Sequence, residues 1–255
     1  MEQFALLLVV FCVLGAQAAP DRTPRIINGQ VAANHPSNAY IVYTREDGYG
    51  YFGGGTIISD RHILTTALII DGFFQWDVGM GSNILSMLGF VNSKTATAHP
   101  QYNPVDRAND IGVITLPVSL VITANVAPIA LPPLDSAYGY PFENEQGTIV
   151  GFGFTDAAAT VKPNYLMRAY QRVTNDIDCQ IYPVTAPNHF CAKDIVEGGN
   201  LCNGDLGAGF ITDVHGQQTI TGVASMIMDP CANTHPTAYT RVEAYRTWIN
   251  TVTGV

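Results

Sequence analysis

The chain has 255 residues, enough for one large all-β domain or for two fused subdomains. Its 24 glycines and 15 prolines follow no period, a composition typical of many short strands joined by turns. The net charge is −9 and the 12 lysines and arginines are scattered, which argues against a basic groove for nucleic acid and against adhesion to anionic membranes.

The N-terminus has the pattern of a secretory signal peptide over residues 1–18. An apolar run at 4–14 is too short to span a bilayer and is followed by small residues, although no Lys or Arg precedes it. The alternative is an N-terminal membrane anchor. Removal of a signal peptide leaves an even number of cysteines, which predicts two disulfides in one of three pairings. These cysteines are Cys179, Cys191, Cys202 and Cys231.

Six segments rich in Ile, Val, Thr and Tyr, bounded by turn residues, are predicted strands. They span 39–45, 51–59, 62–67, 110–116, 148–154 and 218–228. The proline-rich segment 131–134 is predicted to link two halves of the chain, because consecutive prolines cannot donate to a sheet. One amphipathic helix is predicted near the C-terminus, with its apolar face formed by Val242, Tyr245, Trp248, Ile249 and Val252.

Several motifs together resemble the trypsin-like serine protease family, from Ile26 to the end of the chain. Residues 202–209 read Cys-Asn-Gly-Asp-Leu-Gly-Ala-Gly and are similar to the family's nucleophile loop, C-x-G-D-S-G-G-P. Residues 63–69 resemble the base-histidine segment, L-T-A-A-H-C, and residues 25–29 resemble the activation site. Shorter matches are Gly54-Gly55, Asp110-Ile111, Gly151-Phe152-Gly153 and Tyr239-Thr240-Arg241-Val242.

The resemblance implies an all-β fold of two packed antiparallel six-stranded β-barrels with a C-terminal α-helix. It divides the chain into a propeptide at 19–25, an N-terminal barrel at about 26–133, and a C-terminal barrel and helix at about 134–255. It also selects the disulfides Cys179–Cys191 and Cys202–Cys231.

The same resemblance implies an activation step at the N-terminal end of the domain. Cleavage after Arg25 would free the α-amino group of Ile26 to pair with Asp205. The alternative is an inherited sequence that is never cleaved.

The resemblance also places hydrocarbon side chains where the chemistry should be. Leu68 stands where relatives have the base histidine and Leu206 where they have the nucleophilic serine, while Asp110 matches the third triad member. Acyl transfer needs an activated hydroxyl and an oriented base, so we expect an inert site in which the two leucines touch. Backbone donors of Gly204 and Leu206 are expected to remain from the oxyanion hole. Asp110 is expected to be satisfied by the backbone of Ala67 and Leu68 and by the Ser225 hydroxyl.

The specificity pocket departs from the family in parallel. Asn200 matches the pocket floor, Ser225 belongs to the wall, and Ile227 and Thr237 stand where relatives have wall glycines. We therefore predict a narrowed or filled pocket; the alternative is that neighbouring insertions leave it open. The cysteines of a further family disulfide are replaced by Gly53 and Ile69, so we expect the loop that carries Leu68 to be less constrained.

These expectations favour a secreted, extracellular pseudoprotease, similar to arthropod serine protease homologues without a clip domain. It would act as a monomer that binds a protein: a protease, a protease substrate, an inhibitor or an immune component. No cofactor and no metal are expected, because the six histidines show no ligand spacing. The first alternative is an unusual hydrolase that uses Asp110 or a displaced histidine. The second is a storage or digestive-fluid protein without a specific partner.

Overall fold

A computed structural model describes residues 29–183, 187–194, 199–229, 231 and 235–255. The predicted signal peptide, the propeptide, Arg25 and Ile26 lie outside the described residues. Within the described part of the chain, no helix has the length and apolar character needed to cross a membrane.

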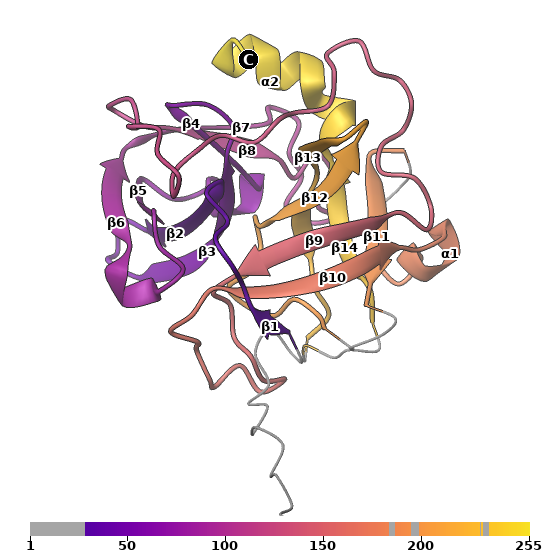
Figure 1. Ribbon diagram of the computed structural model, residues 1–255, viewed down its shortest axis with the longest axis horizontal. Coiled ribbons are helices and arrows are strands. Elements are labelled where there is room, and N and C mark those ends of the chain that lie inside the picture. The colour runs from indigo at the N-terminus through magenta and orange to yellow at the C-terminus, as the bar shows by residue number, and fades with distance from the viewer. Residues whose placement is uncertain (1–28, 184–186, 195–198, 230, 232–234) are drawn as a thin grey trace, which may run out of the picture.

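The first half of the chain forms a curled antiparallel sheet of seven strands in the order β6-β5-β2-β3-β4-β8-β7 (Figure 1). Strand β2 shows why it curls around a core, since Ala39, Ile41 and Tyr43 alternate inward and join one buried cluster. The resemblance implied a closed six-stranded barrel here; the described strands instead form an open sheet whose two edges are consecutive in the chain. The strands are β2 (Asn38–Thr44), β3 (Gly50–Ile57), β4 (His62–Thr65), β5 (Gln75–Met80), β6 (Gly89–Ser93), β7 (Thr95–Ala98) and β8 (Gly112–Thr115).

The second half forms a closed barrel of six strands, β10-β11-β14-β13-β12-β9, in which β9 pairs back onto β10. A seventh strand from the start of the described chain, β1, joins the outside of β10. The family fold is therefore present, and the N-terminal segment belongs to the second sheet. The strands are β1 (Gln30–Val31), β9 (Gln146–Gly151), β10 (Met167–Val173), β11 (His189–Lys193), β12 (Gly209–Val214), β13 (Gln217–Met226) and β14 (Thr237–Arg241).

The C-terminal segment starts as the 3-10 helix η3 (Val242–Tyr245) and continues as α2 (Arg246–Thr253), where one helix was predicted. Its apolar face packs on the first sheet, because Val242 and Ile249 share a buried cluster with Leu64 of β4. Figure 1 shows α2 lying across the end of the molecule near both sheets. The other short helices are η1 (Ala67–Ile69), η2 (Leu85–Met87) and α1 (Asp176–Cys179).

The segment between the two sheets is tied to the C-terminal end of the chain. The Glu243 carboxylate accepts hydrogen bonds from the backbone N–H groups of Tyr138 (3.1 Å), Gly139 (2.6 Å) and Tyr140 (2.9 Å). Nε of Arg246 donates to the Pro132 carbonyl at 2.6 Å. The two halves of the chain are therefore fixed to one another at their junction.

Two disulfides bridge the second half, Cys179–Cys191 and Cys202–Cys231. This is the pairing that the family resemblance implied. By loop-closure entropy each bridge stabilises the fold by about 3 kcal/mol.

Candidate functional site

Asp110 lies at the junction of the two sheets and is fully buried. Its Oδ1 accepts from the backbone N–H of Leu68 at 2.9 Å, and its Oδ2 accepts from Oγ of Ser225 at 2.6 Å. Burial raises the pKa of Asp110 to about 6, and the hydrogen bonds from Ser225 and from the backbone of Leu68 and Ala67 partly offset that rise. The carboxylate thus joins the first sheet, η1 and β13 at one point, as the sequence predicted.

The loops that carry Leu68 and Leu206 meet at strand β3. Leu206 O accepts from the backbone N–H of Gly54 at 2.7 Å. Cδ1 of Ile69, next to Leu68, lies 2.6 Å from where a Cβ on Gly53 would be and 2.9 Å from where one on Gly207 would be. Backbone oxygens are close too, since a Cβ would lie 2.8 Å from Leu206 O at Gly53 and 2.2 Å from Gly54 O at Gly207, so both places require glycine. Leu68 and Leu206 are each partly exposed. The contact that we expect between the two leucine side chains stays a prediction.

The loop that carries Leu68 is held in place without the family's disulfide. Ile69 is fully buried, and its side chain fills the space beside Gly53 where the bridge would run. Nε1 of Trp76 donates to the Ile69 carbonyl at 2.9 Å. The expectation of a loosened loop is thus not supported, because apolar packing and an indole hydrogen bond take over the role of the bridge.

Ile69→Ala is expected to lower the free energy of unfolding by about 2–5 kcal/mol, because it removes a fully buried side chain between two glycines. Urea denaturation measures the change. Met87→Ala, at a side chain that is 67% exposed, is the matched control and should change stability by less than about 0.5 kcal/mol. Equal effects of the two substitutions would mean that Ile69 does not anchor the loop.

The backbone at Gly204 and Asp205, in the loop predicted to resemble the family's oxyanion hole, is tightly enclosed. Gly204 has φ +98°, and a Cβ there would lie 2.1 Å from Cε2 of Phe52. The next residue, Asp205, is fully buried and accepts from the N–H groups of Gly153 (2.8 Å) and Cys202 (3.1 Å). Burial raises the pKa of Asp205 to about 7. The proposed pairing of Asp205 with Ile26 falls on a residue outside the described part of the chain.

The predicted pocket floor is occupied by a polar network. Oδ1 of Asn200 accepts from Nε2 of Gln171 (3.0 Å) and from Oγ1 of Thr237 (2.9 Å). Nδ2 of Asn200 donates to the His235 carbonyl at 2.8 Å, and the Tyr239 hydroxyl donates to Oε1 of Gln171 at 2.8 Å. Asn200, Gln171, Thr237 and Tyr239 are all buried. The amide of Asn200 is therefore engaged with the protein itself.

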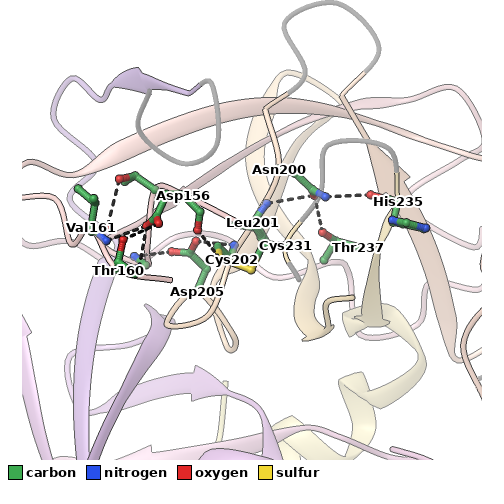
Figure 2. The surroundings of a disulfide bond; sticks show 12 residues. Asp156, Thr160, Val161, Asn200, Leu201, Cys202, Asp205, Cys231, His235 and Thr237 are labelled. Carbon is green, nitrogen blue, oxygen red and sulfur yellow. Dashed lines mark hydrogen bonds between the residues drawn. A yellow bond between two sulfur atoms is a disulfide. The ribbon is translucent and has the colours of Figure 1, made fainter. Parts of the chain in front are cut away.

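Figure 2 shows part of this network on one side of the Cys202–Cys231 bridge, with Asn200 hydrogen-bonded to Thr237 and to the His235 carbonyl. On the other side lies Asp156, whose carboxylate accepts from the backbone of Thr160 and Val161. The wall residue Ile227 packs against the core of the second sheet. Sequence reasoning missed Gln171, because a glutamine within an alternating strand gives no sign that its inward side chain meets the pocket floor.

A second candidate for a base and a hydroxyl is the pair His62 and Ser59, in another part of the fold. Oγ of Ser59 and Nδ1 of His62 are 2.8 Å apart in the turn between β3 and β4. The Ser59 oxygen also accepts from the backbone N–H of Arg61 at 3.1 Å, an interaction typical of a tight turn. Five residues of extended chain separate this pair from Gly54 at the candidate site, roughly 17 Å. The pair therefore lies away from the loops that carry Leu68 and Leu206.

The family model described as Trypsin matches residues 26–249, which is most of the chain. The chain belongs to the trypsin family. It is 28% identical to a chymotrypsin of Phaedon cochleariae over 242 residues, covering 92% of this chain and 84% of the relative. It is also 28% identical, over 83% of this chain and 62% of the relative, to the inactive CLIP domain-containing serine protease A8 of Anopheles gambiae. The solved structure of HL collagenase superposes with a TM-score of 0.79 at 28% identity, covering 90% of this chain and 99% of the collagenase chain.

Within this trypsin-family frame, the positions predicted for the base and the nucleophile carry apolar side chains. Asp110 keeps two hydrogen bonds that fix η1 and β13, while neither Leu68 nor Leu206 can transfer a proton or donate an electron pair. The pocket floor is closed by hydrogen bonds among Asn200, Gln171 and Thr237.

Benzamidine is expected to bind with a dissociation constant weaker than about 1 mM, because Asn200 is already engaged and Thr237 replaces a wall glycine. Isothermal calorimetry makes the measurement, with an active trypsin as the positive control. Millimolar or tighter binding would show that the pocket is open.

Proposed function

We propose that this trypsin-family protein is a secreted pseudoprotease that acts by binding another protein rather than by cleaving it. One observation carries the proposal. The Asp110 network that fixes the two halves of the site is intact, yet hydrocarbon side chains occupy the base and nucleophile positions on either side of it. The hydrogen bonds that position the site are retained, while the side chains at the base and nucleophile positions cannot carry out acyl transfer.

The expected loss in catalytic rate favours a binding function over residual hydrolysis. Loss of the nucleophile or the base in a serine protease typically costs about a millionfold in rate, or roughly 8 kcal/mol of barrier. The oxyanion hole alone accelerates only a substrate that can dock, and the pocket floor is filled by Gln171, Asn200 and Thr237. An Anopheles relative is itself named inactive, so such members occur in this family.

Secretion is supported by the chemistry of the cysteines. Two disulfides persist in an oxidising compartment, and the apolar segment at 4–14 has the pattern of a signal peptide. Loops on a rigid barrel can bind a protein without any chemistry. The proposed partners are a protease, a protease substrate, an inhibitor or an immune component.

A rearranged hydrolase is the second candidate, and the Ser59–His62 contact is the observation that favours it. Hydrolysis by this pair would be lost in Ser59→Ala. The first candidate predicts that this substitution changes nothing measurable, because the pair lies in a turn away from the loops that carry Leu68 and Leu206.

Site-specific photocrosslinking in the native secretion tests the binding function. A photoreactive residue at Leu206 should give one crosslinked partner, competed by excess unlabelled protein, while the same probe at Val121 should not give it. Val121 is 80% exposed and belongs to neither of the loops that carry Leu68 and Leu206, so it controls for nonspecific crosslinking. A storage protein would give no saturable product at either position, and that result would remove the binding proposal.

A further inference from the structure

The outer face of β10 carries a row of cationic and aromatic side chains. Arg168, Tyr170 and Arg172 alternate with the buried residues Ala169 and Gln171, so the first three share the outward side of the strand. The register of β11 adds Lys193 beside Arg172. Three cations therefore share one face of a chain with net charge −9, and one of them, Lys193, already forms a salt bridge with Asp178 at 2.9 Å.

The two arginines are incompletely satisfied by the protein. Nε of each is buried and has no hydrogen-bond partner within the described residues. One Nη of Arg168 donates to Oε1 of Gln30 at 3.0 Å, and the Arg168 guanidinium lies 5.1 Å from the Tyr170 ring centroid. An external ligand cannot reach these buried Nε–H groups, so it can contact only the terminal Nη groups of the two partly exposed arginines.

A cavity of about 490 Å³ opens beside the row, between the two sheets. Thr148 lines it and is the cross-strand partner of Tyr170. His35 lines it too, and burial together with the nearby Arg168 charge lowers the pKa of His35. The other polar lining groups include the side-chain amides of Asn34, Gln217 and Gln218.

We propose that this surface, the β10 row with its adjoining cavity, binds an acidic oligosaccharide: a chain of sugar rings bearing sulfate or carboxylate groups. Guanidinium groups pair with such oxyanions in bidentate geometry. The exposed Tyr170 ring offers a flat face for a sugar, and the amides and the Thr148 hydroxyl can exchange hydrogen bonds with sugar hydroxyls. Arg168 and Arg172 are about 13 Å apart along the strand, so the row spans more than one ring.

An acidic peptide fits the surface less well. Peptides commonly add a strand to a free sheet edge, but β10 pairs with β9 on one side and with β1 and β11 on the other. Only residues 169–171 lie between the β1 and β11 pairings.

Calorimetry on the whole protein with four probes tests the proposal: a heparin hexasaccharide, a hyaluronan hexasaccharide, neutral maltohexaose and a hexaglutamate peptide. We expect saturable binding of a charged oligosaccharide and none of maltohexaose. The heparin and hyaluronan arms distinguish sulfate from carboxylate as the recognised group. Because the whole chain has net charge −9, general electrostatic repulsion opposes the binding of an anion, so any affinity must come from the local row.

The double substitution Arg168→Gln with Arg172→Gln should weaken binding at least about tenfold. The matched control removes the same charge elsewhere, through Arg45→Gln with Lys94→Gln at two exposed residues, and should weaken binding less than about twofold. Tyr170→Ser should lose several-fold and Tyr170→Phe should not, which separates ring stacking from folding defects. Absence of saturable binding, equal loss in the control pair, or tighter binding of hexaglutamate would overturn the proposal.

Discussion

Restoring the two missing side chains, by Leu68→His with Leu206→Ser, is expected to rebuild a reactive serine without restoring family-level hydrolysis. Asp110 already faces η1 and Ser225, so an introduced imidazole has its orienting carboxylate. A small fluorophosphonate, which needs little of the pocket, should label the double variant and leave the natural chain unlabelled. Peptide substrates should still be cleaved at less than about a thousandth of the kcat/KM of an active relative, because the pocket floor is filled.

A second set of substitutions tests whether the filled pocket limits hydrolysis by the double variant. Adding Thr237→Gly and Ile227→Gly to the double variant should raise kcat/KM for substrates with an apolar side chain at least about tenfold. Substituting Phe90→Gly, at an exposed site on β6, should not raise it. Family-level cleavage by the double variant alone would show that the pocket accepts side chains as it stands.

Two buried carboxyls are expected to stabilise the uncleaved chain as pH falls from 7.5 to 5, opposing His35, His62 and His99, whose pKa values are lowered by burial. Burial raises the pKa of Asp110 to about 6 and that of Asp205 to about 7, so both bind protons more tightly in the folded state than in the unfolded state. Their stabilising contribution is complete below the unfolded value of 3.8 and is lost as pH rises through 6 and 7. Between pH 7.5 and pH 5 the contribution is about 1 kcal/mol for Asp110 and about 3 kcal/mol for Asp205, measured as the free energy of unfolding in urea.

The variant Asp205→Asn should lack the part of this pH dependence that the Asp205 carboxyl contributes. Asp156→Asn is the matched control: hydrogen bonds to Thr160 and Val161 lower the pKa of Asp156, so its effect falls below pH 4 and leaves the slope between pH 5 and 7.5 unchanged. Cleavage after Arg25 that brought the Ile26 ammonium beside Asp205 would also lower the pKa of Asp205 and remove its share. An Asp205→Asn variant whose stability keeps the same dependence on pH between 5 and 7.5 as the natural chain would contradict this assignment for Asp205.

The sequence predicted much of the fold because its signals are local or carried by family motifs. Strand periodicity located β2, β3 and β13 to within a few residues, and the spacing of Val242 and Ile249 predicted the terminal apolar face. The open first sheet was missed, since closure depends on pairing between distant strands that a pattern of residue types does not specify.

The sequence predicted the hydrogen bonds of Asp110, which follow from a family motif. It did not predict the roles of Gln171 and Ile69, which depend on side-chain packing. The hydrogen-bond donors to Asp110, the Leu68 N–H and the Ser225 hydroxyl, are those that its place in the motif implied. The role of Gln171 depends on which residues lie across the barrel, and the support of the Leu68 loop depends on how Ile69 fills a space left by a missing disulfide. Both are properties of packing, to which no motif refers.

Hydrolysis by the purified natural chain, before and after cleavage at Arg25, tests the central claim most directly. Fluorogenic peptides and activated esters cover the family's substrate range, and Asp110→Ala and Ser59→Ala serve as the two diagnostic variants. The account predicts rates equal to the uncatalysed background in every sample, at least about a millionfold below an active relative. Turnover by the natural chain that disappears with either substitution would contradict it.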